Sequence, residues 1–296
     1  MIEGQQGLTW PRWQRLVEAA ESLGFAGLYR SDHFTDPSPP DQDSLELWVS
    51  LTWAASHSRR LAIGPLVAPV SFRDPIMLAR TAMQVDDLSG GRLELGLGAG
   101  WNEREHTMFG YPLLSVDERF ARFEEALQIV SALLRGTEPV SFAGRYYQLQ
   151  EARLLPTPSR PHGPPIVIGG NGPLRTLPLV ARYADQWNAV YIGGEQFAER
   201  CQRLDALLLE AGRAPSSVKR TLMTGLIFAP DAAELADKLA GRPIAGLRER
   251  GLIVGTPDDI RQQTAQLAGF GVERLMVQWI ALDDLAGLEQ LARAVL

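Results

Sequence analysis

Two glycine-rich runs are the segments of this sequence best suited to holding a bound molecule. The runs Gly98-Ala99-Gly100-Trp101-Asn102 and Gly169-Gly170-Asn171-Gly172 each follow a short apolar stretch. Glycines let backbone N–H groups turn toward an anion, and the N-terminus of a following helix adds a favourable dipole. Each run fits either a phosphate-binding loop or an ordinary tight turn, since neither completes the dinucleotide-binding or Walker pattern.

His33 is the histidine whose position suggests chemistry. It follows the apolar stretch 27–30 directly, within Ser31-Asp32-His33-Phe34. An imidazole there could exchange a proton near neutral pH or hydrogen-bond a bound ring, and the alternative is a structural histidine bonded to backbone. The other histidines show no metal-ligand spacing, so no metal site is predicted. Trp101, at the end of an apolar stretch, is the tryptophan expected to line a pocket.

The elements that must position these residues follow an alternation of short apolar stretches and segments of helical period. This pattern is typical of parallel strands joined by crossover helices, and it predicts an α/β fold, a (β/α)8 TIM barrel in one domain spanning 1–296. Strands are expected at 27–30, 61–67, 92–97, 165–168, 186–190, 218–228 and 273–279, with helices between them, among them 75–88 and a segment at 174–184 that starts late or kinks at Pro178.

Two features depart from this regular alternation. Only Met1, Ile2 and Glu3 precede Gly4, so the first strand is either short or truncated, because a barrel strand needs about five residues. The stretch 139–149, after the fourth helix, reads as a hairpin insertion that could serve as a lid. In a parallel barrel the loops after the strands form the face that carries the active site, so His33 and both glycine runs should meet there.

The composition narrows the class of partner. The chain has 29 Lys and Arg against 35 Asp and Glu, a formal net charge of −6, and no basic stripe, which argues against nucleic-acid binding. Gly and Pro interrupt the apolar runs well before the roughly 18 residues of a membrane span. The single cysteine, Cys201, falls on a helical apolar stripe and fits core packing better than catalysis. These features predict a cytoplasmic protein that binds neither nucleic acid nor membrane.

Several segments together resemble the luciferase-like monooxygenase superfamily, in the branch that uses coenzyme F420, an 8-hydroxy-5-deazaflavin. They occur in family order over residues 9–190: Ala20-Glu21-Ser22-Leu23-Gly24-Phe25, Ser31-Asp32-His33-Phe34, Phe72-Arg73-Asp74-Pro75, Leu88-Ser89-Gly90-Gly91-Arg92, the two glycine runs, and Ala184-Asp185-Gln186-Trp187-Asn188.

The resemblance implies an oxidoreductase with a flavin-type ring at the C-terminal mouth of a barrel. His33 would lie beside the ring and serve proton balance, with Asp32 among the cofactor-binding residues. The stretch Leu66-Val67-Ala68 would pack against the ring face, next to a non-proline cis peptide bond. The two glycine runs would cradle the ribityl phosphate, and a homodimer is a family expectation.

The resemblance leaves the chemistry open between three alternatives. The favoured one is hydride transfer between coenzyme F420 and a small organic substrate, in which the protein mainly supplies position and electrostatics. The second is an FMN-dependent monooxygenase that uses reduced flavin and O2, and the third is a flavin- or deazaflavin-binding protein without catalysis. In the sugar-phosphate dehydrogenase branch a glutamate occupies the position of Trp101, so that substrate is not expected here.

Overall fold

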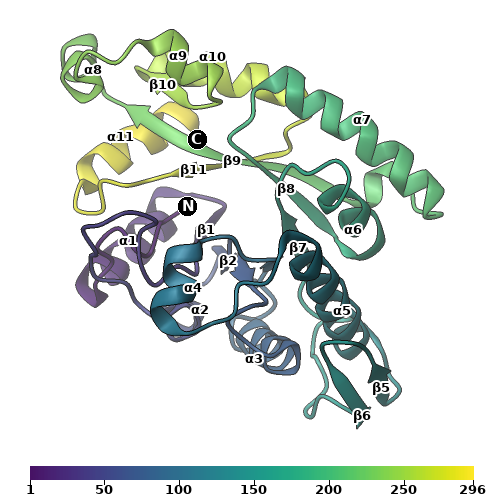
Figure 1. Cartoon of the computed structure of the whole chain (residues 1–296). Coiled ribbons are helices and arrows are strands. Elements are labelled where there is room, and N and C mark those ends of the chain that lie inside the picture. The colour runs from purple at the N-terminus through teal and green to yellow at the C-terminus, as the bar shows by residue number, and fades with distance from the viewer.

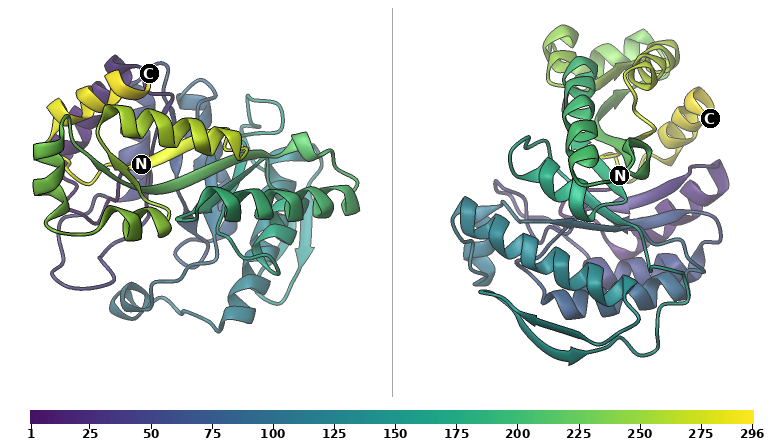
Figure 2. Two further views of the ribbon diagram at one scale, coloured as in Figure 1. Left: turned by 90° about the horizontal axis from the view of Figure 1, so that it is seen from above. Right: turned by 90° about the vertical axis from the view of Figure 1, so that its right-hand side faces the viewer.

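The computed structural model describes all 296 residues as parallel strands surrounded by helices. Figure 1 shows the whole chain, and the right-hand view of Figure 2 shows helices on both sides of the strands. The strands are β1 (Gly27–Arg30), β2 (Ala62–Pro65), β3 (Ala68–Pro69), β4 (Leu95–Gly98), β5 (Val140–Ala143), β6 (Gln148–Ala152), β7 (Ile166–Gly169), β8 (Gln186–Val190), β9 (Lys219–Phe228), β10 (Ile253–Gly255) and β11 (Arg274–Gln278).

The helices alternate with the strands along the chain. They are α1 (Trp10–Leu23), α2 (Leu47–His57), α3 (Pro75–Leu88), α4 (Glu103–Phe109), α5 (Val116–Arg135), α6 (Thr176–Tyr183), α7 (Gly194–Glu210), a 3₁₀ turn (Pro215–Ser217), α8 (Ala232–Leu239), α9 (Ile244–Glu249), α10 (Pro257–Gly269) and α11 (Leu285–Val295). None of them is long and apolar enough to cross a membrane.

Local sequence explains where the helices begin and end. The Asp74 side chain accepts a hydrogen bond from the Ile76 amide, and Pro75 occupies the first turn of α3, where its missing N–H costs nothing. Helix α1 ends at Gly24, which adopts φ +93°, a conformation that favours glycine. Helix α6 starts at Thr176 and holds Pro178 in its first turn, which confirms the predicted late start.

The parallel strands form the wall of a (β/α)8 barrel, as the sequence predicts. β1 pairs with β2, a bridge between Ile63 and Leu93 leads to β4, and β7, β8, β9 and β11 follow in order. Between β11 and β1 the wall is joined only by Met1 and Ile2. The first strand is therefore reduced to a stub, as its short sequence predicts.

Other details differ from the sequence prediction. Helix α4 and strand β10 were not predicted, because each is short and lacks a clear hydrophobic period. The strand expected at 61–67 is shorter, since β2 ends at Pro65; a cis peptide bond joins Leu66 to Val67, and β3 begins after it at Ala68. That non-proline cis bond is the one that the family resemblance implies.

The predicted hairpin exists as β5 and β6, but it is not a lid in this structure. It packs along α5, where the Glu125 carboxylate accepts hydrogen bonds from the amides of Arg145, Tyr146 and Tyr147. None of its residues lines the candidate site described below. The insertion follows α5, so its position is set by that helix on the outside of the barrel.

The barrel interior combines an apolar layer with one buried ion pair. Met1, Tyr29, Leu66, Val167, Met223 and Met276 pack together inside the wall. The Glu94 carboxylate accepts a hydrogen bond from the Tyr29 hydroxyl at 2.6 Å and from Arg274 Nη1 at 2.7 Å. Because both partners satisfy the carboxylate, a charge is tolerated where water is largely excluded. This network ties β1 and β4 to β11.

Candidate active site

A cavity of about 650 Å³ lies at the C-terminal mouth of the barrel, within the range of small-molecule and cofactor sites. Each strand of the wall contributes to its lining, either directly or through the residues that follow it. Its lining residues are Glu3, Gln5, Gln6, Ser31, His33, Asp36, Pro37, Leu66, Val67, Pro69, Gly100, Trp101, Glu105, Gly169, Gly170, Asn188, Val190, Tyr191, Met223, Gln278 and Ile280. The cavity thus brings His33 together with Gly100 and Trp101 of the first glycine run and Gly169 and Gly170 of the second.

His33 is held by a buried carboxylate. Its Nδ1 lies 2.8 Å from Oε1 of Glu105, whose other oxygen accepts the Phe34 amide at 3.0 Å. The side chain of Glu105 is only 1% exposed. With Nδ1 engaged in this way, Nε2 forms no hydrogen bond within the protein and is the ring nitrogen left for a ligand. The Trp101 ring meets the imidazole edge-on, with centroids 5.4 Å apart.

The surroundings of His33 favour its charged form. Burial is the largest influence and disfavours the imidazolium, but the hydrogen bond and charge of Glu105, with Glu3 and Asp32 behind it, outweigh burial and raise the pKa of His33 above 6.5. A raised pKa means that the pair stabilises the fold fully below about pH 6.5. That contribution is lost as the pH rises through the raised pKa.

Glu105→Gln tests this coupling directly. We expect the variant to keep its fold but to lose the charge that does most to raise the pKa of His33, so that burial weighs more against the imidazolium and the pKa falls. The titration profile of the His33 imidazole, followed by NMR, should therefore move to lower pH. Glu103→Gln, an exposed neighbour on α4, is the matched control and should leave the profile in place. An identical profile for both variants would contradict the coupling.

One wall of the cavity is flat because glycines lie beneath Val67. A Cβ atom at Gly98 would lie 2.7 Å from Cγ2 of Val67, and one at Gly169 would lie 3.2 Å from Cγ1. Larger residues at these positions would push Val67 into the cavity. The glycines at the ends of β4 and β7 thus make room for Leu66 and Val67 to form an apolar wall.

Two unsatisfied donors lie beside the first glycine loop. The Gly100 carbonyl accepts from Arg119 Nη1 at 2.9 Å, while Arg119 Nε and Asn102 Nδ2 are buried without a partner in the protein. Across the mouth, Arg200 Nε reaches the carbonyl of Asn171 at 3.2 Å. Buried donors without acceptors are costly, so an anionic group at the first loop would complete its hydrogen bonding.

The predicted site residues divide into two groups. His33, Leu66, Val67, Gly100, Trp101, Gly169 and Gly170 line the cavity. The remainder lie behind that lining: Asp32, Ala68, Gly98, Ala99, Asn102, Asn171 and Gly172. Asp32 is buried and accepts hydrogen bonds from the Arg73 guanidinium. Asn171 holds the loop through Nδ2, which donates to the Val190 carbonyl at 2.6 Å.

Sequence reasoning missed the polar residues that come from the N-terminal stub and from α4. Glu105 lies one residue before His106, and no motif in the sequence links it to His33, which is 72 positions away. Glu3 accepts a hydrogen bond from Gln5 Nε2 at 3.0 Å and another from Gln278 Nε2. Gln278 could have been found from the sequence, because it stands at the end of the last strand, where site residues are expected.

Comparison with known proteins agrees with this geometry. The family model described as luciferase-like monooxygenase matches residues 2–250. An F420-dependent glucose-6-phosphate dehydrogenase of Kineococcus radiotolerans is 29% identical over 90% of this chain and 77% of that protein. An F420-dependent hydroxymycolic acid dehydrogenase of Mycobacterium tuberculosis is 32% identical, over 92% of this chain and 73% of that protein.

Among solved structures, an F420-dependent secondary alcohol dehydrogenase in complex with an F420-acetone adduct superimposes with a TM-score of 0.83. It is 19% identical to this chain, and the match covers 100% of this chain and 98% of that one. With a family model that spans most of its length and a shared barrel fold, this chain belongs to the luciferase-like monooxygenase family of enzymes.

Proposed function

We propose that this enzyme transfers a hydride between coenzyme F420 and a small, uncharged organic substrate. The observation that carries the proposal is the His33–Glu105 pair at the mouth of a cavity with one apolar wall. Two relatives at about 30% identity are F420-dependent dehydrogenases, which supports a deazaflavin rather than FMN.

The residues of the cavity suit a flat ring that carries a phosphate. Leu66 and Val67 would pack against the ring face, and the phosphate would lie at the loop of Gly100, behind which the donors of Asn102 and Arg119 are unpartnered. Gly169 and Gly170 would contact the same phosphate from its other side. When bound, a deazaflavin supplies a carbon that accepts or gives a hydride as a two-electron carrier.

His33 would donate or accept the proton that accompanies hydride transfer. In carbonyl reduction, the substrate carbon gains a hydride and its oxygen takes the proton held at Nε2 of His33. In alcohol oxidation, the same nitrogen takes the hydroxyl proton as the carbon loses its hydride. Glu105 keeps Nδ1 occupied and stabilises the imidazolium in either direction.

The lining favours an uncharged, partly apolar substrate. No Lys or Arg lines the cavity, whereas Glu3, Asp36 and Glu105 do. A phosphorylated or carboxylate substrate would meet these three carboxylates, and the one cation of the lining, the His33 imidazolium, is already paired with Glu105. Trp101 is 60% exposed and Ile280 56% exposed, so both offer apolar surface at the entrance. Secondary alcohols and ketones fit this combination.

The decisive experiment is a titration of the purified protein with F420 and with FMN at matched concentrations. Tryptophan fluorescence should be quenched, because Trp101 lies in the lining. We expect tighter binding of F420, followed by anaerobic reduction of bound F420 by one or more members of a panel of secondary alcohols. Tighter binding of FMN, with oxygen uptake in the presence of reduced FMN, would instead assign a monooxygenase. Binding of F420 without turnover of any alcohol or ketone would favour a carrier protein.

Gly170→Ala should weaken F420 binding by about tenfold or more. Gly170 adopts φ +121°, where a side chain is strained by about 1–3 kcal/mol, so the loop must shift away from the phosphate. Gly193→Ala is the matched control, since Gly193 has open space around it and a negative φ. Equal dissociation constants for the two variants would show that the Gly170 loop does not hold the cofactor.

A further inference from the structure

One segment at the mouth of the barrel is held only by side chains. We name residues 35–43, in the loop between β1 and α2, the strap; its Asp36 and Pro37 line the cavity. No backbone–backbone hydrogen bond ties the strap to the rest of the chain, and residues 37–43 are exposed. Exposed backbone without such bonds opens at a lower cost than the rest of a fold, so the position of the strap depends on its side-chain contacts.

Arg104, the second residue of α4, makes most of these contacts. Its Nη1 donates to Thr35 Oγ1 at 2.6 Å, to the Asp36 carbonyl at 2.8 Å and to Oδ1 of Asp41 at 2.6 Å, and its Nη2 donates to Oδ2 of Asp41 at 2.7 Å. The only other side chain bonded to the strap is Gln6, which donates to the Asp36 carboxylate. Because the side chains of Arg104 and Asp41 are 29% and 40% exposed, water competes for their ion pair, and the pair can break at a small cost.

The loop is fixed firmly on either side of the strap. The His33 carbonyl, before the strap, accepts a hydrogen bond at 2.8 Å from the hydroxyl of Ser44, after it. Asp32 is bound by the Arg73 guanidinium, whose Nη2 also donates to Glu46 at 2.6 Å. The two ends of the strap are thus tied to each other, and the strap can swing about them without moving His33.

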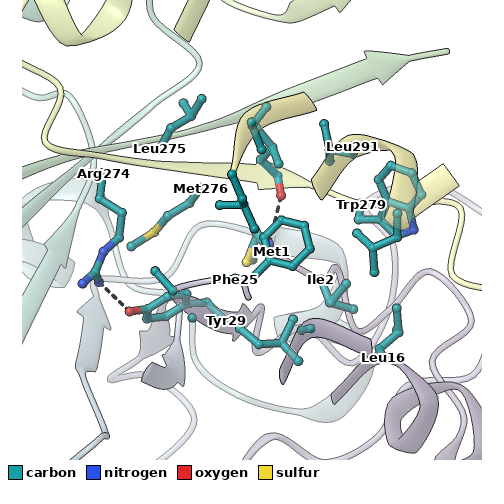
Figure 3. Close-up of a pocket in the computed structure, with 18 of the residues that line it drawn as sticks. Met1, Ile2, Leu16, Phe25, Tyr29, Arg274, Leu275, Met276, Trp279 and Leu291 are labelled. Carbon is teal, nitrogen blue, oxygen red and sulfur yellow. Dashed lines mark hydrogen bonds between the residues drawn. The ribbon is translucent and has the colours of Figure 1, made fainter. Parts of the chain in front are cut away.

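The strand that leads into this loop is fixed as well. Arg30 is fully buried, and it donates through Nη2 to the Leu45 carbonyl at 2.6 Å and through Nη1 to Ser50 Oγ at 2.6 Å. Its neighbour Tyr29 accepts a hydrogen bond at 2.6 Å from Arg274 Nη1 of β11 (Figure 3). Motion in this loop is therefore confined to the strap.

Helix α4 gives the strap a fixed partner. Glu105, next to Arg104, holds the imidazole of His33. At the end of the helix, the Phe109 ring meets the Phe34 ring with centroids 5.1 Å apart. Consecutive residues of α4 therefore have different tasks, since Glu105 orients the imidazole and Arg104 holds the strap.

We propose that the strap is a gate of the cavity and that Arg104 is the positioning residue that keeps it closed. The gate opens when the ion pair of Arg104 with Asp41 breaks, and a bound molecule then leaves past Asp36 and Pro37 while His33 stays in place. Opening of such lids sets the rate of ligand exchange in many enzymes. The proposal requires a ligand in the cavity, but it does not depend on which flavin binds or on the reaction.

The first test follows the strap itself and needs no ligand. A nitroxide label is attached at position 38 through Ser38→Cys, in a Cys201→Ser background that leaves no other cysteine. Arg104→Gln and Asp41→Asn should each make the label more mobile in the electron paramagnetic resonance spectrum, whereas Asp41→Glu, which keeps the carboxylate, should preserve the parent spectrum. Arg182→Gln is the matched control, because its exposed ion pair joins α6 to α5 and lines no part of the cavity.

The second test follows ligand exchange. Association and release of the flavin that binds more tightly, F420 or FMN, are measured by stopped-flow tryptophan fluorescence. In Arg104→Gln both rates should rise by about fivefold, the scale of losing one exposed ion pair, and Kd should stay within about twofold. A gate changes both rates together, whereas a residue that contacts the ligand mainly changes release, and Arg104 lies outside the lining.

Three results would overturn the proposal. An unchanged label spectrum in Arg104→Gln would show that Arg104 does not hold the strap. A more mobile label with unchanged rates of association and release would show that the strap is not a gate. Faster release alone, with weaker binding, would make Arg104 a determinant of affinity and not of opening.

Discussion

His33→Asn is expected to lower turnover of F420 with the best secondary alcohol or ketone by about 10²-fold to 10⁴-fold, the scale of losing a general acid or base. An asparagine amide can still donate to Glu105, so the pocket should keep its shape, but it cannot carry a proton at neutral pH. The measurement is the steady-state rate of F420 absorbance change, with the F420 dissociation constant measured in parallel. We expect that constant to stay within a fewfold of the wild-type value.

His57→Asn serves as the control, because His57 is exposed on α2 and its ring stacks on Trp53 away from the cavity. Its turnover should equal that of the wild type. If His33→Asn also kept full turnover, the proton would have to come from another group. If it lost F420 binding instead, His33 would act as a binding residue and not in proton transfer.

Glu94→Gln is expected to lower the free energy of unfolding by about 3 kcal/mol or more, because it leaves Arg274 as a largely buried cation without a counter-charge. Glu94 is 8% exposed and joins three strands of the wall through Tyr29 and Arg274. Urea denaturation at pH 7 measures the effect. Glu289→Gln is the matched control, since it removes the exposed partner of Arg293, and it should cost less than about 1 kcal/mol.

The pH dependence gives a second check on Glu94. Burial, the largest influence, raises the pKa of its carboxyl, but Arg274 and the Tyr29 hydroxyl outweigh burial and hold it below 4.5. The stabilisation is therefore present above about pH 4.5 and is lost as the pH falls through the lowered pKa. The difference between wild type and Glu94→Gln should shrink over that range. A difference that is constant with pH, or no larger than that of Glu289→Gln, would contradict the role of the pair.

The sequence predicts most strands and helices of this fold well, because hydrophobic periodicity and helix capping depend on residues close together in the sequence. β1, β8 and α3 lie at the predicted residues, since each is bounded by its own turn or cap residues. The assignment of residues 1–296 to a single domain stays a prediction. Helix α4 was not predicted, because its seven residues follow the glycine loop and show no apolar stripe. It nevertheless carries Glu105, the carboxylate that holds His33.

The candidate site was only partly predictable for the same reason. Residues at strand ends, such as Gly100 and Gly170, can be located from the alternation of strands and helices. Which side chains then face inward depends on the loop backbone. Asp32 sits next to His33 in the sequence, yet its carboxylate turns to Arg73, whereas the distant Glu105 meets the imidazole. Contacts of this kind depend on tertiary packing and leave no trace in local periodicity.

The position of β11 at the end of the chain has a consequence for how the protein folds during synthesis. Its residues Arg274 and Gln278 bond to Tyr29 and Glu3, across sequence separations of 245 and 275 residues. Such non-local contacts form late, and at about 5–20 residues per second the ribosome completes the first strands many seconds before the last. Until β11 emerges, the unpaired edge of β9 and the apolar interior around Met223 stay open. The nascent barrel is therefore most vulnerable to aggregation just before its last strand is made.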